Sequence, residues 1–171
     1  MVYTRIAGME DLPALRRLAI STYTDTFGEY YTPGELSQYL VETYSAEKLQ
    51  AEFNEPGAVL YLAFDDDDKM IGFLRLRSNR WADEFPGTNQ VELHQLYVHS
   101  SYRGAGVAKA LVEEAIQYAS KHGYHHIWLS VWENNFRAQK FYAKCGFLSF
   151  RKYSYMVGNE PQVDLLMSRN L

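Results

Sequence analysis

Apolar residues at helical spacing mark the first part of the chain. One segment has an apolar residue at every third or fourth position, at Leu12, Leu15, Leu18, Ala19 and Tyr23. This spacing predicts an amphipathic helix over residues 11–26. The run Thr32-Pro33-Gly34-Glu35 is a capping-box pattern, in which the hydroxyl and the carboxylate satisfy amides at a helix start. It predicts a second helix there, and a third, short helix is expected after Ser45.

The middle of the chain has short apolar runs of strand length, separated by turn residues. These runs predict strands over residues 58–65, 69–77 and 90–99, in addition to a short strand over 2–6. The four aspartates 65–68 lie between two of the runs, so we interpret them as a solvated hairpin turn rather than a metal site. Residues 78–89, with Pro86 and Gly87, are expected to form a polar loop.

The last part alternates helical and strand patterns. We expect a helix over 104–122, a strand over 125–131, a helix over 135–145 that Gly146 ends, and strands over 147–157 and 163–167. The predicted order is an antiparallel meander followed by one β-α-β crossover. It indicates an α/β (α+β) fold with a mixed central sheet.

Length, charge and cysteine content narrow the class of protein. A chain of 171 residues suits a single domain over residues 1–171. A net charge of −4 without a basic stripe argues against a nucleic-acid partner. No apolar run approaches the roughly 20 residues of a membrane span, and Cys145 has no second cysteine to pair with. The N-terminal residues lack a signal-peptide pattern, so we expect a cytoplasmic protein without a membrane partner.

A small-residue turn between a strand and a helix is the most informative feature of the sequence. The predicted strand ends with Leu96, Tyr97 and Val98, and the turn and helix start follow at Arg103, Gly104, Ala105, Gly106, Val107 and Ala108. The first amides of a helix lack intrahelical partners and carry the positive end of its dipole. Glycines let a ligand come close to the backbone. The segment therefore predicts a cradle for a pyrophosphate.

Two well-known phosphate loops do not fit this cradle. A Walker loop ends in Gly-Lys-Ser/Thr, but Lys109 is followed by Ala110. A dinucleotide-binding fingerprint has a third small residue where this chain has Lys109. The Arg/Gln-x-x-Gly-x-Gly/Ala signature of GCN5-related N-acetyltransferases does fit, because Arg103, Gly106 and Ala108 match it in register.

A second motif supports the same resemblance. The segment that begins Asn135-Phe136-Arg137-Ala138 and ends Gly146-Phe147 is similar to that family's Asn-x-x-Ala-x-x-Phe-Tyr-x-x-x-Gly-Phe. The chain thus resembles GCN5-related N-acetyltransferases over essentially its whole length, and further short runs resemble the bacterial PaiA-type spermidine/spermine acetyltransferases. The resemblance implies a mixed, mostly antiparallel sheet of about seven strands flanked by helices. It also implies acetyl-CoA as cosubstrate and direct acetyl transfer to a primary amine, with no resident metal.

The resemblance assigns roles to individual residues. The backbone of Leu96, Tyr97 and Val98 would pair with the pantetheine arm, and residues 103–108 would hold the pyrophosphate. Asn135 and Lys144 would contact the coenzyme. Tyr142 matches the general acid that protonates the leaving thiolate; on periodicity alone, it could equally be a core aromatic beside Phe141.

The general base stays open between two residues. Glu92 and His94 alternate with Leu96 on one side of the strand that leads to the loop. His94 occupies a position where some family members carry a catalytic Glu or His, and an imidazole can accept a proton near neutral pH. A structural role for either residue is the alternative.

An amine pocket is suggested by aromatic and acidic residues. Trp132, Glu133 and Tyr31, with its neighbour Tyr30, combine aromatic faces with a carboxylate, which suits a polyamine cation. Ordinary surface or core positions are the alternative for each. The PaiA-type resemblance implies an N-acetyltransferase for polyamines such as spermidine or spermine. An acetyltransferase for protein N-termini or lysines and a non-catalytic acetyl-CoA-binding regulatory module stay open, and family analogy makes a homodimer a candidate assembly.

Overall fold

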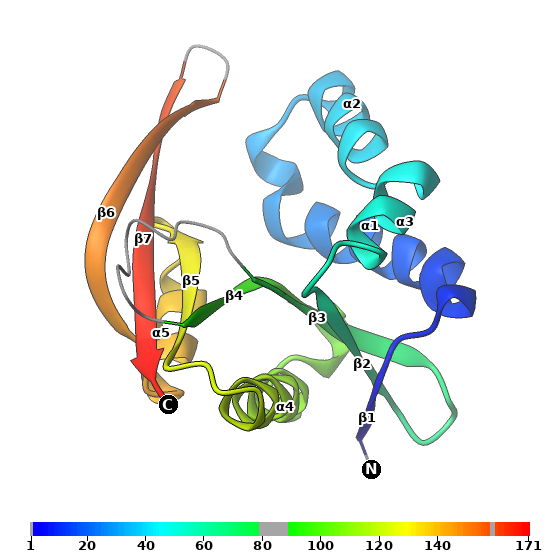
Figure 1. Cartoon of the computed structure of the whole chain (residues 1–171). Helices are drawn as coiled ribbons and strands as arrows, with labels where there is room; N and C mark the ends of the chain where they lie inside the picture. Colours follow the sequence, from blue (N-terminus) through cyan, green and yellow to red (C-terminus); the bar gives the residue numbers. More distant parts are fainter. Residues whose placement is uncertain (1, 79–88, 158–159) are drawn as a thin grey trace. The chain divides into compact units, whose positions relative to one another are not determined.

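The computed structural model describes residues 2–78, 89–157 and 160–171, and its elements are labelled in Figure 1. These residues group into two compact units. The first contains Met1–Arg77 and Gln95–Glu114, and the second contains Ser78–His94 and Ala115–Leu171. That residues 1–171 form a single acetyltransferase domain stays a prediction.

Three antiparallel strands form the sheet of the first unit together with the end of a fourth. β1 (Tyr3–Ile6) pairs with β2 (Val59–Phe64), and β2 pairs with β3 (Met70–Ser78). β4 (Gln90–Val98) leads into this unit, where the amide of His99 donates to the carbonyl of Ile71 at 2.8 Å. The predicted strands are confirmed, and the aspartate run is the turn between β2 and β3, closed by a bond from Asp65 N to Lys69 O at 3.1 Å.

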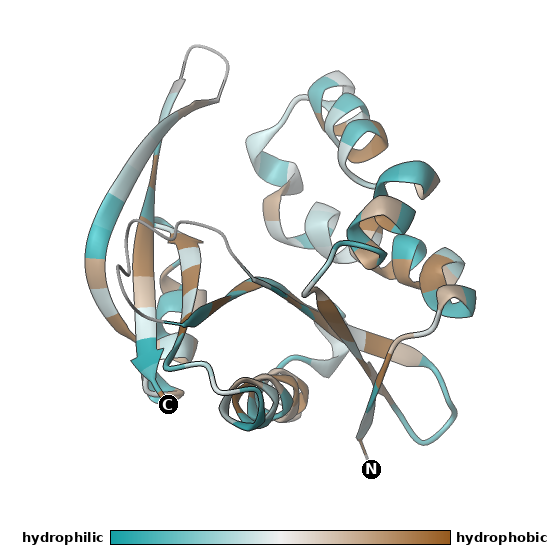
Figure 2. Cartoon of the chain, in the orientation of Figure 1, coloured by the Kyte–Doolittle hydropathy of each residue, from teal (hydrophilic) through white to brown (hydrophobic). Residues whose placement is uncertain are grey.

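The predicted helices precede β2. They are α1 (Leu12–Phe27), α2 (Pro33–Thr43) and α3 (Ala46–Phe53), with short 3-10 turns at Met9–Asp11 and Gly28–Tyr30. The capping box is confirmed, since the Thr32 amide donates to the Glu35 carboxylate at 2.9 Å and the Glu35 amide donates to the Thr32 hydroxyl at 3.4 Å. Figure 2 shows polar and apolar residues interleaved along these helices, as the spacing predicted.

The two faces of β3 carry different packing. Phe73 belongs to a core cluster with Leu15, Leu18, Tyr44 and Leu49 of the helical segment. Gly72 faces the other way: a Cβ at this position would lie 3.1 Å from both the carbonyl oxygen of Tyr97 and the side chain of Val107. The absence of a side chain at Gly72 thus lets the first turn of helix α4 (Val107–Lys121) approach the sheet.

The second unit has a parallel pair and a hairpin. β5 (His126–Trp132) runs parallel to the start of β4, with Gln90 opposite His126. β7 (Glu160–Asn170) lies antiparallel between β5 and β6 (Leu148–Val157), and helix α5 (Phe136–Lys144) connects β5 to β6. The strand order β1-β2-β3-β4-β5-β7-β6, mostly antiparallel with one crossover through α4, confirms the expected mixed α/β fold.

Two predicted boundaries are wrong. Helix α4 begins at Val107 rather than at residue 104, because Gly104 and Gly106 have φ values of +84° and +83°, which no α-helix accommodates. The last strand is Glu160–Asn170 rather than 163–167, because it pairs with a neighbour on each edge. Residues 79–88 of the predicted polar loop, with Pro86 and Gly87, lie outside the described residues.

In the described residues, no helix combines the length and the apolar composition that a bilayer span requires.

Candidate active site

The loop that follows β4 is fixed to the turn between β2 and β3. It begins with a 3-10 turn at Ser100–Tyr102, in which the amide of Tyr102 donates to the carbonyl of His99 at 2.9 Å. The hydroxyl of Tyr102 donates to the carboxylate of Asp65. This bond lowers the pKa of Asp65 and raises that of Tyr102. The acidic run therefore has a structural function, since it holds the start of the loop in place.

The glycines and the helix start form an open cradle of amides. A Cβ built on Gly104 or on Gly106 would meet no atom within 4 Å. The first helical bond runs from Ala110 N to Gly106 O at 3.0 Å, so the amides of Val107, Ala108 and Lys109 precede it. These amides and the helix dipole favour an anion in the space beside the glycines. The geometry fits the predicted pyrophosphate site.

Arg103 and Ala105 complete this loop at the surface. Both residues are exposed, and the guanidinium of Arg103 lies 3.5 Å from the hydroxyl of Thr26 at the end of α1. Arg103 can therefore add a positive charge to the rim of the cradle without being part of the core.

The strand segment predicted to pair with pantetheine is anchored to the core through the half-buried Tyr97. The ring of Tyr97 stacks on Phe73 at 5.5 Å and lies 6.5 Å from Tyr23. Leu96 and Val98 flank this anchored residue. In the described residues, the register of β4 with β5 covers Gln90 to Glu92, so these three residues lie beyond that pairing.

Asn135 has a structural function that the sequence reasoning missed. Its side-chain oxygen accepts a hydrogen bond from the amide of Ala138 at 3.2 Å, so Asn135 is the N-cap of α5. Gln139 holds the preceding turn, because its side-chain amide Nε2 donates to the backbone carbonyls of Trp132 at 3.1 Å and Glu133 at 2.7 Å. An Asn before a helical pattern is a known capping signal that could have predicted this role.

Tyr142 is a core residue whose hydroxyl stays protonated. It is buried, with its ring packed edge-on against Phe141 at 5.3 Å and Phe147 at 5.8 Å. Burial raises the pKa of Tyr142, and the nearby Cys145 adds to the rise. The hydroxyl therefore keeps its proton at neutral pH. Lys144 lies exposed in the last turn of the same helix, where a cation complements the dipole.

The two predicted bases lie in the part of β4 that belongs to the second unit. Glu92 is 5% exposed and lies opposite Trp128 in the parallel register with β5. His94 is half-buried two positions further along. On the same strand, Gln90 accepts a hydrogen bond from the Trp128 indole.

The predicted amine-pocket residues belong to both units. Tyr31 belongs to the first unit, where its hydroxyl is hydrogen-bonded to that of Tyr23 at 2.7 Å, while the neighbouring Tyr30 is 59% exposed. Trp132 and Glu133 are consecutive in the second unit. Glu133 forms an ion pair with Lys152 at 3.5 Å, so its carboxylate already has a cationic partner.

Asp164 is a carboxylate that the sequence reasoning missed. It lies opposite Trp132 in the β5–β7 register and accepts hydrogen bonds from Ser130 at 2.6 Å and Tyr155 at 3.3 Å. The rings of Tyr153 and Tyr155 stack at 5.8 Å on the adjacent strand. No pattern within one strand brings these residues together, because the register of β5, β7 and β6 creates the group.

Comparison with known proteins identifies a family and several relatives. Residues 15–147 match the model of the acetyltransferase (GNAT) family. The chain is 30% identical to an uncharacterized N-acetyltransferase of Lactobacillus delbrueckii subsp. lactis, over 95% of this chain and 93% of that protein. It is 29% identical to the spermidine N(1)-acetyltransferase of Thermoplasma acidophilum, over 84% of this chain and 86% of that protein.

A solved structure is similar over the whole chain. The PaiA N-acetyltransferase of Thermoplasma acidophilum, determined in complex with coenzyme A, superposes with a TM-score of 0.82 at 26% identity. The match covers 100% of this chain and 99% of that one.

The cradle predicts a specific effect of a methyl group at Gly106. In Gly106→Ala, the added Cβ enters the space beside the helix amides, and a left-handed backbone also disfavours alanine. We expect the Kd for coenzyme A, measured by calorimetry, to rise about tenfold or more.

Gly123→Ala is the matched control. Gly123 also has a positive φ, +72°, and open space where a Cβ would be added, but it follows α4 at the other end. This variant should lose similar thermal stability and keep wild-type coenzyme affinity. Equal coenzyme affinity in the two variants would contradict the cradle.

Proposed function

Because the chain belongs to the acetyltransferase (GNAT) family, we propose that it transfers acetyl directly from acetyl-CoA to a primary amine of a polyamine such as spermidine or spermine. That the protein is an acetyl-CoA-dependent N-acetyltransferase follows from the family match over residues 15–147 and the similarity to a coenzyme A complex. The observation that carries the proposal in this chain is the amide cradle at Gly104 and Gly106.

Acetyl-CoA fits the residues that the chain presents. When bound, it supplies an activated thioester and a thiolate leaving group. We assign its pyrophosphate to the amides of residues 104–108, with Arg103 at the rim. The backbone of Leu96–Val98 is assigned to the pantetheine arm, and the Val98 amide to the thioester carbonyl. A main-chain donor at this oxygen stabilises the charge that develops there. Asn135 and Lys144 are assigned further coenzyme contacts.

Tyr142 is proposed as the general acid. A group that donates a proton to a thiolate must be protonated at working pH, and burial gives Tyr142 this property. Its ring is held by Phe141 and Phe147, so the hydroxyl has a defined direction. Tyr142 can have both roles, because its ring packs in the core while its hydroxyl donates the proton.

His94 is proposed as the general base, with Glu92 as the alternative. A base must accept the proton that the attacking ammonium or amine loses, directly or through a water molecule. The half-burial of His94 supports a contact with water, whereas Glu92 is buried. Each assignment stays a proposal on these grounds.

The polyamine specificity rests on similarity and on local chemistry. The spermidine N(1)-acetyltransferase of Thermoplasma acidophilum is 29% identical to this chain. In the second unit, Asp164 is placed among Trp132, Tyr153 and Tyr155, a combination of carboxylate and aromatic groups that suits an ammonium. We assign a substrate ammonium to Asp164 in preference to Glu133, whose carboxylate is paired with Lys152. Tyr31 stays a proposed contact.

The remaining predictions concern location and assembly. A cytoplasmic location, the absence of nucleic-acid and membrane partners, and a homodimer stay predictions from the sequence and the family resemblance.

An acceptor panel tests the proposed substrate. With saturating acetyl-CoA, spermidine and spermine should release coenzyme A thiol with a kcat of about 1 s⁻¹ or more, a typical enzyme rate. Peptides with a free N-terminus or an internal lysine should be much slower under the same conditions. Faster turnover of the peptides would reverse the substrate assignment, and coenzyme binding without turnover of any amine would favour a regulatory module.

Removing the Tyr142 hydroxyl tests the acid. Tyr142→Phe keeps the packing and loses the proton donor, so kcat should fall about 100-fold while coenzyme affinity changes little. The raised pKa means that the wild-type hydroxyl is protonated below about pH 10, so Tyr142 should cause no alkaline loss of activity between pH 7 and that value.

Tyr118→Phe is the control for Tyr142→Phe. Tyr118 lies on α4 and stacks on His122 at 3.9 Å, and it has no assigned role in catalysis. It should retain wild-type kcat. The acid role is wrong if Tyr142→Phe does so as well.

The pH profile of kcat/KM separates the two bases. An essential base must be deprotonated, so activity falls on the acidic side of its pKa. In the variant that lacks the base, kcat/KM should be about 100-fold lower and should no longer fall at acidic pH. We expect this result for His94→Gln and an unchanged profile shape for Glu92→Gln. The opposite pattern would assign Glu92, and two unchanged profiles would exclude both.

A further inference from the structure

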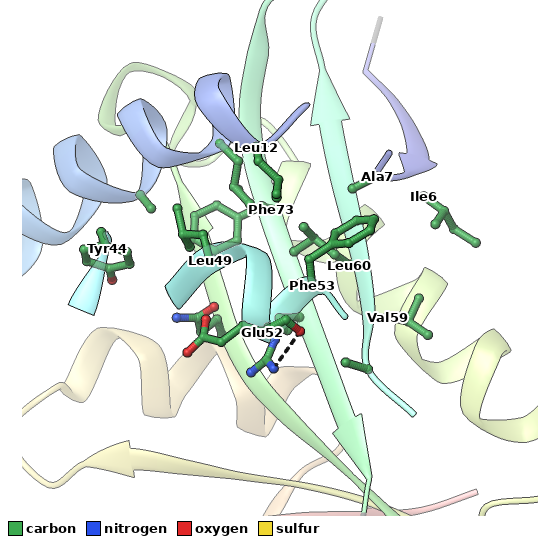
Figure 3. A pocket seen from close by; sticks show the side chains of 15 residues that line it. Ile6, Ala7, Leu12, Tyr44, Leu49, Glu52, Phe53, Val59, Leu60 and Phe73 are labelled. Carbon is green, nitrogen blue, oxygen red and sulfur yellow. Dashed lines mark hydrogen bonds between the residues drawn. The ribbon is translucent and has the colours of Figure 1, made fainter. Parts of the chain in front are cut away.

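A cavity of about 160 Å³ lies within the first unit, where α1 and α3 cover β2, β3 and the end of β4. Figure 3 labels side chains from α1, α3, β2 and β3 around it. Most of its wall is apolar, and the lining includes Leu12, Leu15, Leu49, Phe53, Leu60 and Phe73. It is separate from the cradle, because none of the loop residues 99–108 lines it.

The cavity has a buried floor and a partly exposed mouth. Leu15, Tyr44 and Phe73 are at most 3% exposed, so they form the floor. Glu52 and Phe53 of α3, with Ala58 in the loop that follows, are half-buried and border solvent. A ligand must therefore enter with an apolar part first and keep a polar group at the mouth.

The mouth of the cavity has one charged group that is paired, Arg75, and one carboxylate, Glu52, that forms no ion pair with a described lysine or arginine. Arg75 is 4% exposed and is neutralised by an ion pair with the Glu55 carboxylate. It also donates to the backbone carbonyl of Glu52 at 3.1 Å, the bond drawn as a dashed line in Figure 3. Among the described residues, no lysine or arginine forms an ion pair with the carboxylate of Glu52. This carboxylate gives the mouth a negative charge that a ligand can complement.

Tyr44, in the floor of the cavity, has a raised pKa. Burial is the main cause, and Tyr97, Tyr39 and Glu52 add smaller contributions in that order.

We propose that this cavity binds a compact primary monoamine, with a single aromatic ring or a branched aliphatic group as its body and the ammonium at Glu52. An apolar cavity of about 150 Å³ is large enough for a benzene-sized group. A polyamine fits less well, because its further ammonium groups would lie against the apolar floor without a counter-charge. The proposal thus adds a ligand class to the proposed function and does not depend on it.

The position of the cavity allows such a ligand either to be acetylated or to bind without being acetylated. Gln95 lines it and immediately precedes Leu96, the start of the segment assigned to the coenzyme. A bound monoamine is therefore either an additional acetyl acceptor or a ligand that is not acetylated. The binding chemistry is the same in both cases.

Titration with benzylamine, in the absence of acetyl-CoA, tests the site. Benzyl alcohol is the neutral probe of the same shape, and binding is followed by calorimetry and by shifts of amide resonances. Benzylamine should bind about tenfold more tightly than benzyl alcohol, and Glu52→Gln should reduce this preference to nearly onefold. Absence of benzylamine binding, or an unchanged preference in Glu52→Gln, would overturn the proposal.

A matched pair of Ala→Leu variants locates the bound probe. Ala58→Leu adds bulk at the mouth and should weaken benzylamine binding about tenfold or more. Ala51→Leu places the same side chain on an exposed position of α3 that does not line the cavity, so it should leave binding unchanged. Equal binding by both variants would place the probe elsewhere. Glu52→Gln, a near-isosteric change at a half-buried position, keeps the test decisive if Ala58→Leu does not fold.

Adding acetyl-CoA then distinguishes the two fates. Formation of N-acetylbenzylamine, detected by mass spectrometry and reduced in Ala58→Leu, makes the monoamine an acceptor. Binding without product makes it a separate ligand, and both results support the site. Failure of spermidine turnover would refute the polyamine proposal and leave benzylamine binding unaffected.

Discussion

The backbone between β4 and α4 has to pass through two left-handed residues before a helix can begin. Gly104 and Gly106 have φ values of +84° and +83°, a region that disfavours side chains. This constraint delays the start of α4 to Val107 and leaves the first helical amides beside a space that no protein atom fills. The coenzyme assignment depends on that arrangement, because a helix that began at residue 104 would place its own turn there.

Other contacts hold this loop from both sides. Tyr102 is anchored to Asp65 in the β2–β3 turn, and Tyr97 is stacked on Phe73 in the core. Gly72 lets Val107 approach the sheet closely. The proposed anion site is thus held by contacts with the sheet and a turn, which would keep its donors oriented before a ligand arrives. Several residues assigned to chemistry also stabilise the fold: Asn135 caps α5, and the ring of Tyr142 packs in the core of the second unit.

The tyrosines lie in two different environments. In the first unit, Tyr23 is in contact with Tyr31, Tyr39 and Tyr97, and burial raises its pKa strongly, so this group is a hydrogen-bonded core. In the second unit, Tyr153 and Tyr155 lie on a strand face beside Asp164. The same residue type is therefore part of the core in one place and beside a carboxylate, to which we assign a substrate ammonium, in another. Composition alone does not distinguish the two, because both need an apolar ring with a polar end.

Local signals in the sequence determined much of this protein. The helix starts at Thr32 and Ser45, the stop at Gly146 and the β2–β3 turn depend on neighbours a few residues away, and all could be predicted for that reason. The glycine turn before α4, to which we assign the pyrophosphate, could be predicted because its residues belong to one continuous segment. Tertiary structure decided what depends on pairing between distant segments. The register of β5, β7 and β6 placed Asp164 opposite Trp132, and the packing of α1 and α3 on the sheet left a cavity with Glu52 at its mouth. Strand register and imperfect packing are set by the whole core, so no local sequence motif predicts them.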